Sequence, residues 1–100
     1  MEIGITYFQK MKVVIQSGSA ATGWKEIEGS YYYFNLEYAN MITGWEQIDG
    51  IWYYFKKDGD GVNWSGREGS RLHGDSSGNL KVWITDKEYE FDSNGHCLNP

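Results

Sequence analysis

One aromatic segment occurs twice in this chain: TGWKEIEGSYYYF spans residues 22–34, and TGWEQIDGIWYYF spans residues 43–55. The copies are offset by 21 residues, and eight of their thirteen aligned positions are identical. A fixed period of about 20 to 50 residues is typical of repeat proteins, in which each unit buries its apolar face by stacking on a neighbour. The sequence therefore predicts a short array of similar units.

Each copy has the pattern of a β-hairpin. Glu28-Gly29 in the first copy, and Asp49-Gly50 in the second, lie between two strand-like runs, and such a pair is a strong hairpin signal because glycine tolerates the backbone angles of the turn. In the second copy the expected strands are residues 45–48 and 52–55. An isolated hairpin is marginally stable in water. We therefore expect an all-β fold, a short β-solenoid of stacked aromatic hairpins with atypical caps at both ends.

The rest of the chain follows the period less closely. We interpret residues 1–21 as a degenerate N-terminal repeat or cap, 22–61 as the two clear hairpin repeats, 62–80 as an irregular loop or a diverged repeat, and 81–100 as a C-terminal capping hairpin. In the last of these, Glu88 stands where Trp52 stands in the second copy. Charge on one face suits a terminal unit, because that face meets water. Trp83 is expected to pack within this cap.

Composition excludes several classes of function. The chain has a net charge of −5 and an aromatic content of 17%. An acidic surface argues against nucleic acid, since binding a polyanion needs lysine and arginine to replace its counterions. It suits a cationic or uncharged ligand better. No apolar run is long enough to cross a membrane, so membrane insertion is not expected.

Catalytic and metal-binding patterns are also missing. Cys97, His73 and His96 are the only cysteine and histidines, and they match no metal-ligand spacing that we recognise. The histidines lie in loop-like surroundings and the carboxylates are scattered, so we expect a protein that is not an enzyme and has no cofactor. A single cysteine excludes an internal disulfide. Cys97 is then either a tolerated thiol or the site of an intermolecular disulfide.

The repeated segments resemble a known family. A Gly-Trp pair, an Asp-Gly or Glu-Gly turn, and an aromatic run ending in Phe, repeated about every twenty residues, resemble the choline-binding repeats of cell-wall-binding modules. The junction 38–45 and the ending 88–98 look similar to such modules at the C-termini of clostridial and phage lysins. The resemblance implies a non-catalytic module that recognises choline on the teichoic acid of the bacterial wall. In this family, two cage aromatics come from one hairpin and a third from the next, and Met or Leu often closes the floor.

The chemistry of the ligand supports this interpretation. A trimethylammonium group has no N–H to donate, so aromatic faces are its natural partners. Carried over to this chain, the first cage combines Trp24, Tyr31, Tyr53 and Met41. The second cage combines Trp45 and Trp52 with a third ring, which is either Tyr89 or Trp64.

Two rival interpretations stay open. Aromatic platforms also stack on sugars, so the array could be a carbohydrate-binding module of the glucan or glycan-receptor kind. It could also be an oligomerisation element of a larger wall protein, in which dimerisation covers an exposed aromatic end. We expect the bacterial cell wall or surface as the location. Because no signal peptide is visible, the chain would be released by cell lysis or be part of a larger protein.

Overall fold

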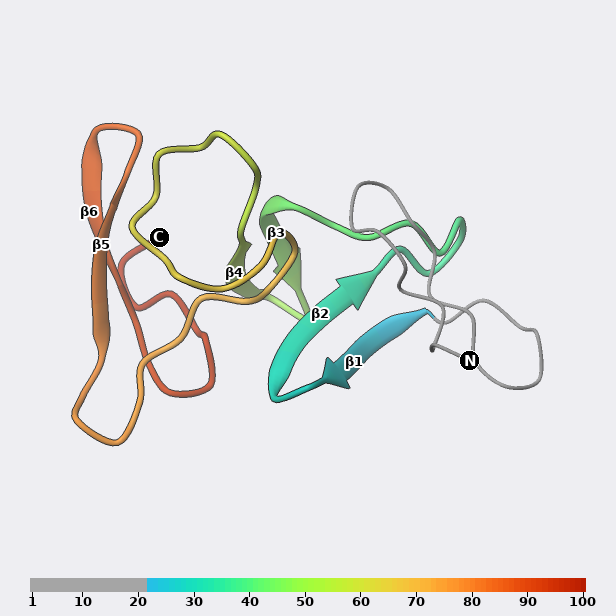
Figure 1. The fold of residues 1–100 in the computed structure, drawn as a ribbon, viewed down its shortest axis with the longest axis horizontal. Coiled ribbons are helices and arrows are strands. Elements are labelled where there is room, and N and C mark those ends of the chain that lie inside the picture. The colour runs from blue at the N-terminus through green and yellow to red at the C-terminus, as the bar shows by residue number, and fades with distance from the viewer. Residues whose placement is uncertain (1–21) are drawn as a thin grey trace. The chain divides into compact units, whose positions relative to one another are not determined.

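The computed structural model describes residues 22–100, and these belong to two compact units that divide between Ile42 and Thr43. The interpretation of residues 1–21 as a repeat or cap lies outside the described residues. Among the described residues, the first unit holds one β-hairpin and the second holds two (Figure 1). The all-β prediction is confirmed for this part of the chain. Residues 22–100 contain no helix of the length and hydropathy that a membrane span requires.

The first unit is built on the first copy of the repeat. Strands β1 (Gly23–Ile27) and β2 (Ser30–Phe34) pair antiparallel. Tyr32 and Phe34 are buried, and Ile27 and Met41 pack against them. These side chains form a small apolar cluster, which a two-stranded ribbon needs in order to persist in water.

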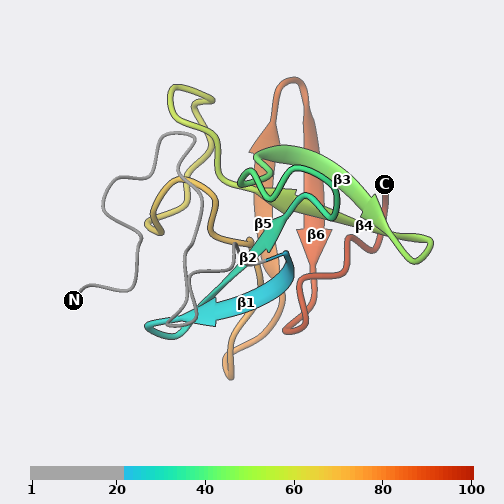
Figure 2. The ribbon, with the colours of Figure 1, turned by 90° about the vertical axis from the view of Figure 1, so that its right-hand side faces the viewer.

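The second unit contains two hairpins of the same kind. Strands β3 (Gly44–Ile48) and β4 (Ile51–Phe55) form one, and strands β5 (Leu80–Ile84) and β6 (Lys87–Phe91) form the other. Figure 2 shows β5 and β6 side by side along their whole length. The two strands of the β3–β4 hairpin each begin one residue earlier than predicted, because Gly44 and Ile51 also pair across the hairpin.

The turns of the hairpins carry the backbone angles that the sequence predicts. Glu28 and Gly29 have φ values of 53° and 85°, and Asp49 and Gly50 have values of 54° and 84°. Two successive positive φ values are characteristic of the tight turn whose twist matches that of the flanking strands. In the third hairpin, Thr85 takes a φ of 62°. A β-branched residue is strained in this region, because its side chain crowds the backbone.

This strain predicts a stabilising substitution. We expect Thr85→Asn to raise the free energy of unfolding by about 1 kcal/mol, because asparagine adopts a positive φ with little penalty. Chemical denaturation followed by tryptophan fluorescence measures the change. The matched substitution Gly50→Ala is expected to act in the opposite direction by a similar amount, since the space around Gly50 is open and only its φ opposes a side chain. A Thr85→Asn variant that is less stable than the parent chain would contradict the assignment of strain.

After each hairpin the chain turns and comes back to the end of the second strand. Antiparallel bridges join Phe34 to Met41, Phe55 to Arg71, and Phe91 to Cys97. In the second hairpin, the return is fixed by hydrogen bonds from the Lys56 amide to the Ser70 carbonyl and from the Leu72 amide to the Tyr54 carbonyl, both 3.0 Å long. Met41, Arg71 and Cys97 are therefore equivalent positions of one structural repeat. The middle repeat differs by a longer excursion between its strand and its bridge.

One carboxylate organises that excursion, which Figure 1 shows as the yellow loop that follows β4. Asp60 accepts hydrogen bonds from the hydroxyl of Tyr54 and the ammonium of Lys56, both at 2.8 Å, and from the amides of Val62 at 2.9 Å and Lys57 at 3.0 Å. Burial alone would raise the pKa of the Asp60 carboxyl, but these bonds outweigh it and hold the pKa at about 2. Burial, followed by the bond to Asp60, raises the pKa of Tyr54.

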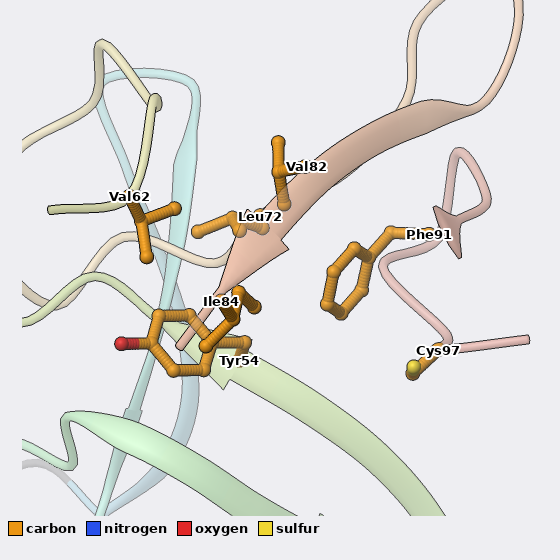
Figure 3. Close-up of a cluster of buried hydrophobic side chains, with 7 residues drawn as sticks. All are labelled: Tyr54, Val62, Leu72, Val82, Ile84, Phe91 and Cys97. Carbon is orange, nitrogen blue, oxygen red and sulfur yellow. The ribbon is translucent and has the colours of Figure 1, made fainter. Parts of the chain in front are cut away.

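The core of the second unit lies between its two hairpins and the intervening loop. Figure 3 shows Ile84 beside the ring of Tyr54, whose hydroxyl points away from the cluster. The cluster draws its buried side chains from β4, the loop, β5, β6 and the final return: Tyr54, Val62, Leu72, Val82, Ile84, Phe91 and Cys97. Trp45, Trp52 and Tyr89 are partly buried and pack against it. This core holds the two hairpins together and leaves aromatic rings at its edge.

Candidate aromatic ligand site

Those rings line a pocket in the second unit. Its volume is about 370 Å³, and its walls are the side chains of Trp45, Trp52, Tyr89 and Pro100. The first two come from the β3–β4 hairpin and the third from the β5–β6 hairpin. The walls are predominantly apolar. A pocket of this size and composition suits a small organic group rather than a metal ion or a phosphate.

The register of the β3–β4 hairpin explains why two tryptophans share the pocket. Trp45 lies directly opposite Tyr54, and Gln47 lies opposite Trp52. Side chains on alternate residues share a face, so Trp45 and Trp52 are diagonal neighbours on the same face. Their ring centroids are 6.3 Å apart, and the ring planes are almost perpendicular at 83°. They form two walls of a corner.

Tyr89 of β6 adds a third aromatic wall. Its ring centroid is 4.8 Å from that of Trp45, with an interplanar angle of 64°. Trp64, the alternative third ring, is placed elsewhere: its indole N–H donates to the Ser70 hydroxyl at 3.0 Å, and its ring contacts His73 edge to face at 5.3 Å. It packs against the core and does not line the pocket.

The last residues of the chain tie the two hairpins together beside the pocket. The amide of Cys97 donates to the carbonyl of Trp52 at 2.9 Å, and the amide of Leu98 donates to the carbonyl of Glu90 at 2.8 Å. Residues 97–98 thus link β4 to β6. The segment continues to Pro100, which forms the fourth wall. Sequence reasoning missed Pro100, because no local pattern indicates that the segment folds back over the tryptophans.

Asn99 holds this segment on β6 through its side chain. Its carboxamide oxygen accepts from the amide of Glu90 at 2.8 Å, and its carboxamide nitrogen donates to the carbonyl of Glu88 at 3.0 Å. The side chain therefore forms hydrogen bonds with the backbone edge of β6, as a neighbouring strand would. This double contact positions the backbone on either side of Asn99, including Pro100.

The side-chain ammonium group of a lysine lies against one of the pocket rings. The ammonium of Lys87 is 4.9 Å from the centroid of the Tyr89 ring, which is within the range of a cation–π interaction. It also donates to the backbone carbonyl of Asn99 at 3.1 Å. Lys87 was not among the residues predicted from the sequence.

The first predicted cage draws on both units, and it stays a prediction. In the first unit, Trp24 lies opposite Tyr33, with an edge-to-face contact at 5.2 Å, and Tyr31 is its diagonal neighbour on the same face. Met41 packs against the small core of that unit. In the second unit, Tyr53 is buried, and this burial raises the pKa of its hydroxyl.

The structure also defines the environments of Trp83 and Cys97. The expectation that Trp83 packs within the cap is wrong: its side chain is 62% exposed, because it lies on the face of β5 opposite to that of the buried Val82 and Ile84. Cys97 is buried in the core, and its burial raises the pKa of the thiol. Within residues 22–100, no group of three or more histidine, cysteine or acidic residues is arranged to hold a metal ion.

A family model described as the choline-binding repeat matches residues 21–62, which include both copies of the aromatic segment. Both matched copies form the predicted hairpins, and the resemblance inferred from the sequence is confirmed. No curated protein sequence matches the chain.

Solved structures of choline-binding proteins are similar to the chain. The choline binding domain of Spr1274 from Streptococcus pneumoniae is 27% identical, with a TM-score of 0.59, over 78% of this chain and 84% of that domain. Choline binding protein F from the same organism, solved in the presence of a peptidoglycan analogue, shares the fold with a TM-score of 0.71 at 23% identity. That match covers 99% of this chain but 28% of the larger protein. The chain thus spans about a quarter of that relative.

Proposed function

We propose that this chain is a non-catalytic cell-wall-binding module that holds choline units of teichoic acid in aromatic pockets. The observation that carries the proposal is the pocket in which Trp45 and Trp52 of one hairpin meet Tyr89 of the next. Its rings lie at steep angles to one another, so a compact cation can contact more than one aromatic face at once. The family assignment of residues 21–62 supports choline as the cation.

The free energy of choline binding expected at one such site is modest. Each desolvated aromatic contact to a quaternary ammonium is worth about 1 to 2 kcal/mol, so three rings give a dissociation constant of roughly tens of micromolar to several millimolar. A wall polymer presents many copies of its head group. Binding at more than one point then raises the retention of the protein through effective concentration. Weak individual sites are therefore adequate for a wall-binding module, which we place at the bacterial surface.

The composition of the pocket favours a cation over a sugar. A sugar site needs polar groups that bond the ring hydroxyls, in addition to an aromatic platform. The pocket walls are two indoles, a phenol and a proline ring. We therefore retain the carbohydrate-binding function only as the alternative outcome of a competition experiment.

The direct test is a titration of the folded protein with choline. We expect a saturable change in tryptophan fluorescence, because Trp45 and Trp52 line the site. Tetramethylammonium should give a similar change, whereas glucose and N-acetylglucosamine should not compete. Absence of any response at tens of millimolar choline, with the fold intact by circular dichroism, would contradict the proposal. Binding of an oligosaccharide without choline binding would favour the carbohydrate alternative.

A further inference from the structure

Lys87 occupies a position from which it can act on a bound ligand. It lies on β6 two residues before Tyr89, and side chains at this spacing point to the same face. Its ammonium is 4.9 Å from the centre of the Tyr89 ring and 3.1 Å from the carbonyl of Asn99, the residue that precedes Pro100. Tyr89 and Pro100 are both pocket walls. The charge therefore lies beside one pocket wall and next to the residue that precedes another, a position that we take as the rim of the pocket.

Among residues 22–100, no side chain forms an ion pair with Lys87. Within the part of the chain that the structure describes, the ion pairs that form involve other residues. Glu88 and Glu90 alternate with Tyr89 along the strand and so point to the opposite face of β6. The Glu90 carboxylate accepts a hydrogen bond from the Asn79 side chain at 2.9 Å. The rim of the pocket thus has an ammonium with a backbone carbonyl as its partner.

A fixed positive charge beside an aromatic cation site has opposite effects on two kinds of ligand. It repels a ligand that carries only a positive charge, such as choline. It attracts a ligand in which an anionic group lies a few bonds from the quaternary nitrogen, because the nitrogen can enter the pocket while the anion reaches the rim. The bond to Asn99 uses one of the three N–H donors of an ammonium group, and others can bond an anionic oxygen.

We propose that Lys87 is a specificity-determining residue that makes the Trp45–Trp52–Tyr89 pocket prefer a phosphate ester of choline over choline itself. This inference rests on the proposed function, since it requires that the pocket binds the quaternary ammonium. It adds a second contact point, at which Lys87 bonds the phosphate by a charge-assisted hydrogen bond. The ligand is then recognised as a zwitterionic unit.

Calorimetric titrations with choline and with phosphocholine, at one low ionic strength, test the inference. We expect the parent chain to bind phosphocholine at least about threefold more tightly than choline, an effect of the size of one partly exposed charge-assisted contact. In Lys87→Gln, phosphocholine should bind more weakly and choline slightly more tightly, so that the preference disappears. Lys87→Arg should keep it. Lys81→Gln is the matched control, because it removes the same charge from the opposite face of the hairpin.

The outcomes separate this inference from a structural role and from failure of the pocket itself. If Lys87→Gln weakens both ligands equally, Lys87 only supports Tyr89 and the inference is overturned. It is also overturned if the parent chain does not distinguish the two ligands. If neither ligand binds to the folded parent chain, the proposed function fails first.

Phosphocholine occurs on wall polymers and as a lipid head group, so the carrier needs its own measurement. Cosedimentation of the parent chain and Lys87→Gln with phosphocholine-bearing cell walls, and with phosphatidylcholine vesicles, compares the two. We expect retention on the walls that declines in Lys87→Gln. Retention on the vesicles alone would overturn the assignment of the ligand to the wall.

Discussion

Replacing Trp52 with alanine is expected to weaken choline binding by about tenfold, with a range of roughly five- to thirtyfold. The estimate corresponds to the loss of one desolvated aromatic contact of about 1 to 2 kcal/mol. Trp52 is the suitable target because it lines the pocket while remaining at the edge of the core. Trp45 also contacts Tyr54, Tyr89 and Phe91, so its removal would disturb the fold as well as the site.

The chain offers a matched control for this experiment. Trp83 is exposed on the outer face of β5, away from the pocket, and Trp83→Ala should leave the affinity for choline within about a factor of two. Calorimetry is preferable to fluorescence here, because each variant loses a fluorophore. An equal loss of affinity in Trp52→Ala and Trp83→Ala would show that binding is not located in the proposed pocket.

Replacing Asp60 with alanine is expected to lower the free energy of unfolding of the second unit by about 3 kcal/mol. The side chain of Asp60 is 8% exposed and that of Lys56 is 16% exposed, so the substitution leaves a largely buried ammonium without its carboxylate. It also removes the acceptor for the Tyr54 hydroxyl and for two backbone amides. Unpartnered buried donors cost more than a hydrogen bond contributes. Denaturant-induced unfolding measures the effect. Asp60→Asn should lower the free energy of unfolding by less, because one oxygen acceptor remains.

The same residue predicts how stability depends on pH. The pKa of Asp60 is about 2 in the folded chain, compared with an ordinary value of 3.8. Because the folded-state pKa is lower, ionised Asp60 contributes stability above about pH 4, and this contribution is lost as the pH falls through 2. The loss amounts to about 2 kcal/mol. The difference in stability between the parent chain and Asp60→Asn should narrow over this interval. A difference that stays constant from pH 5 to pH 2 would contradict the assignment.

The hairpins and the two tryptophans of the pocket could be predicted from the sequence because their signals are local. The Asp-Gly and Glu-Gly turns set the register, and the register places Trp45 and Trp52 on one face. The third ring could be reduced only to Tyr89 or Trp64, since the choice depends on how the chain between β4 and β5 folds. That segment returns to Phe55 through a backbone bridge at Arg71.

The equivalence of Met41, Arg71 and Cys97 explains why the repeat was difficult to follow beyond Phe55. These positions share backbone hydrogen bonds rather than side-chain chemistry, so three unrelated residue types occupy them. Pro100 was missed for a similar reason, because its place in the pocket arises from the fold-back of residues 97–100, which is a long-range contact. Lys87 is a local neighbour of Tyr89 on β6, but its bond to the Asn99 carbonyl depends on the same fold-back.

The two hydrogen bonds between the Asn99 side chain and β6 also have a consequence for solubility. The outer side of a terminal strand offers N–H and C=O groups that can recruit a strand from another molecule, which is a common first step toward aggregation. In this chain the amide of Glu90 and the carbonyl of Glu88 are already occupied by a carboxamide. The Asn99 side chain and the Leu98 amide thereby cover this part of the β6 edge against pairing with another strand, in addition to holding the fourth wall of the pocket in place.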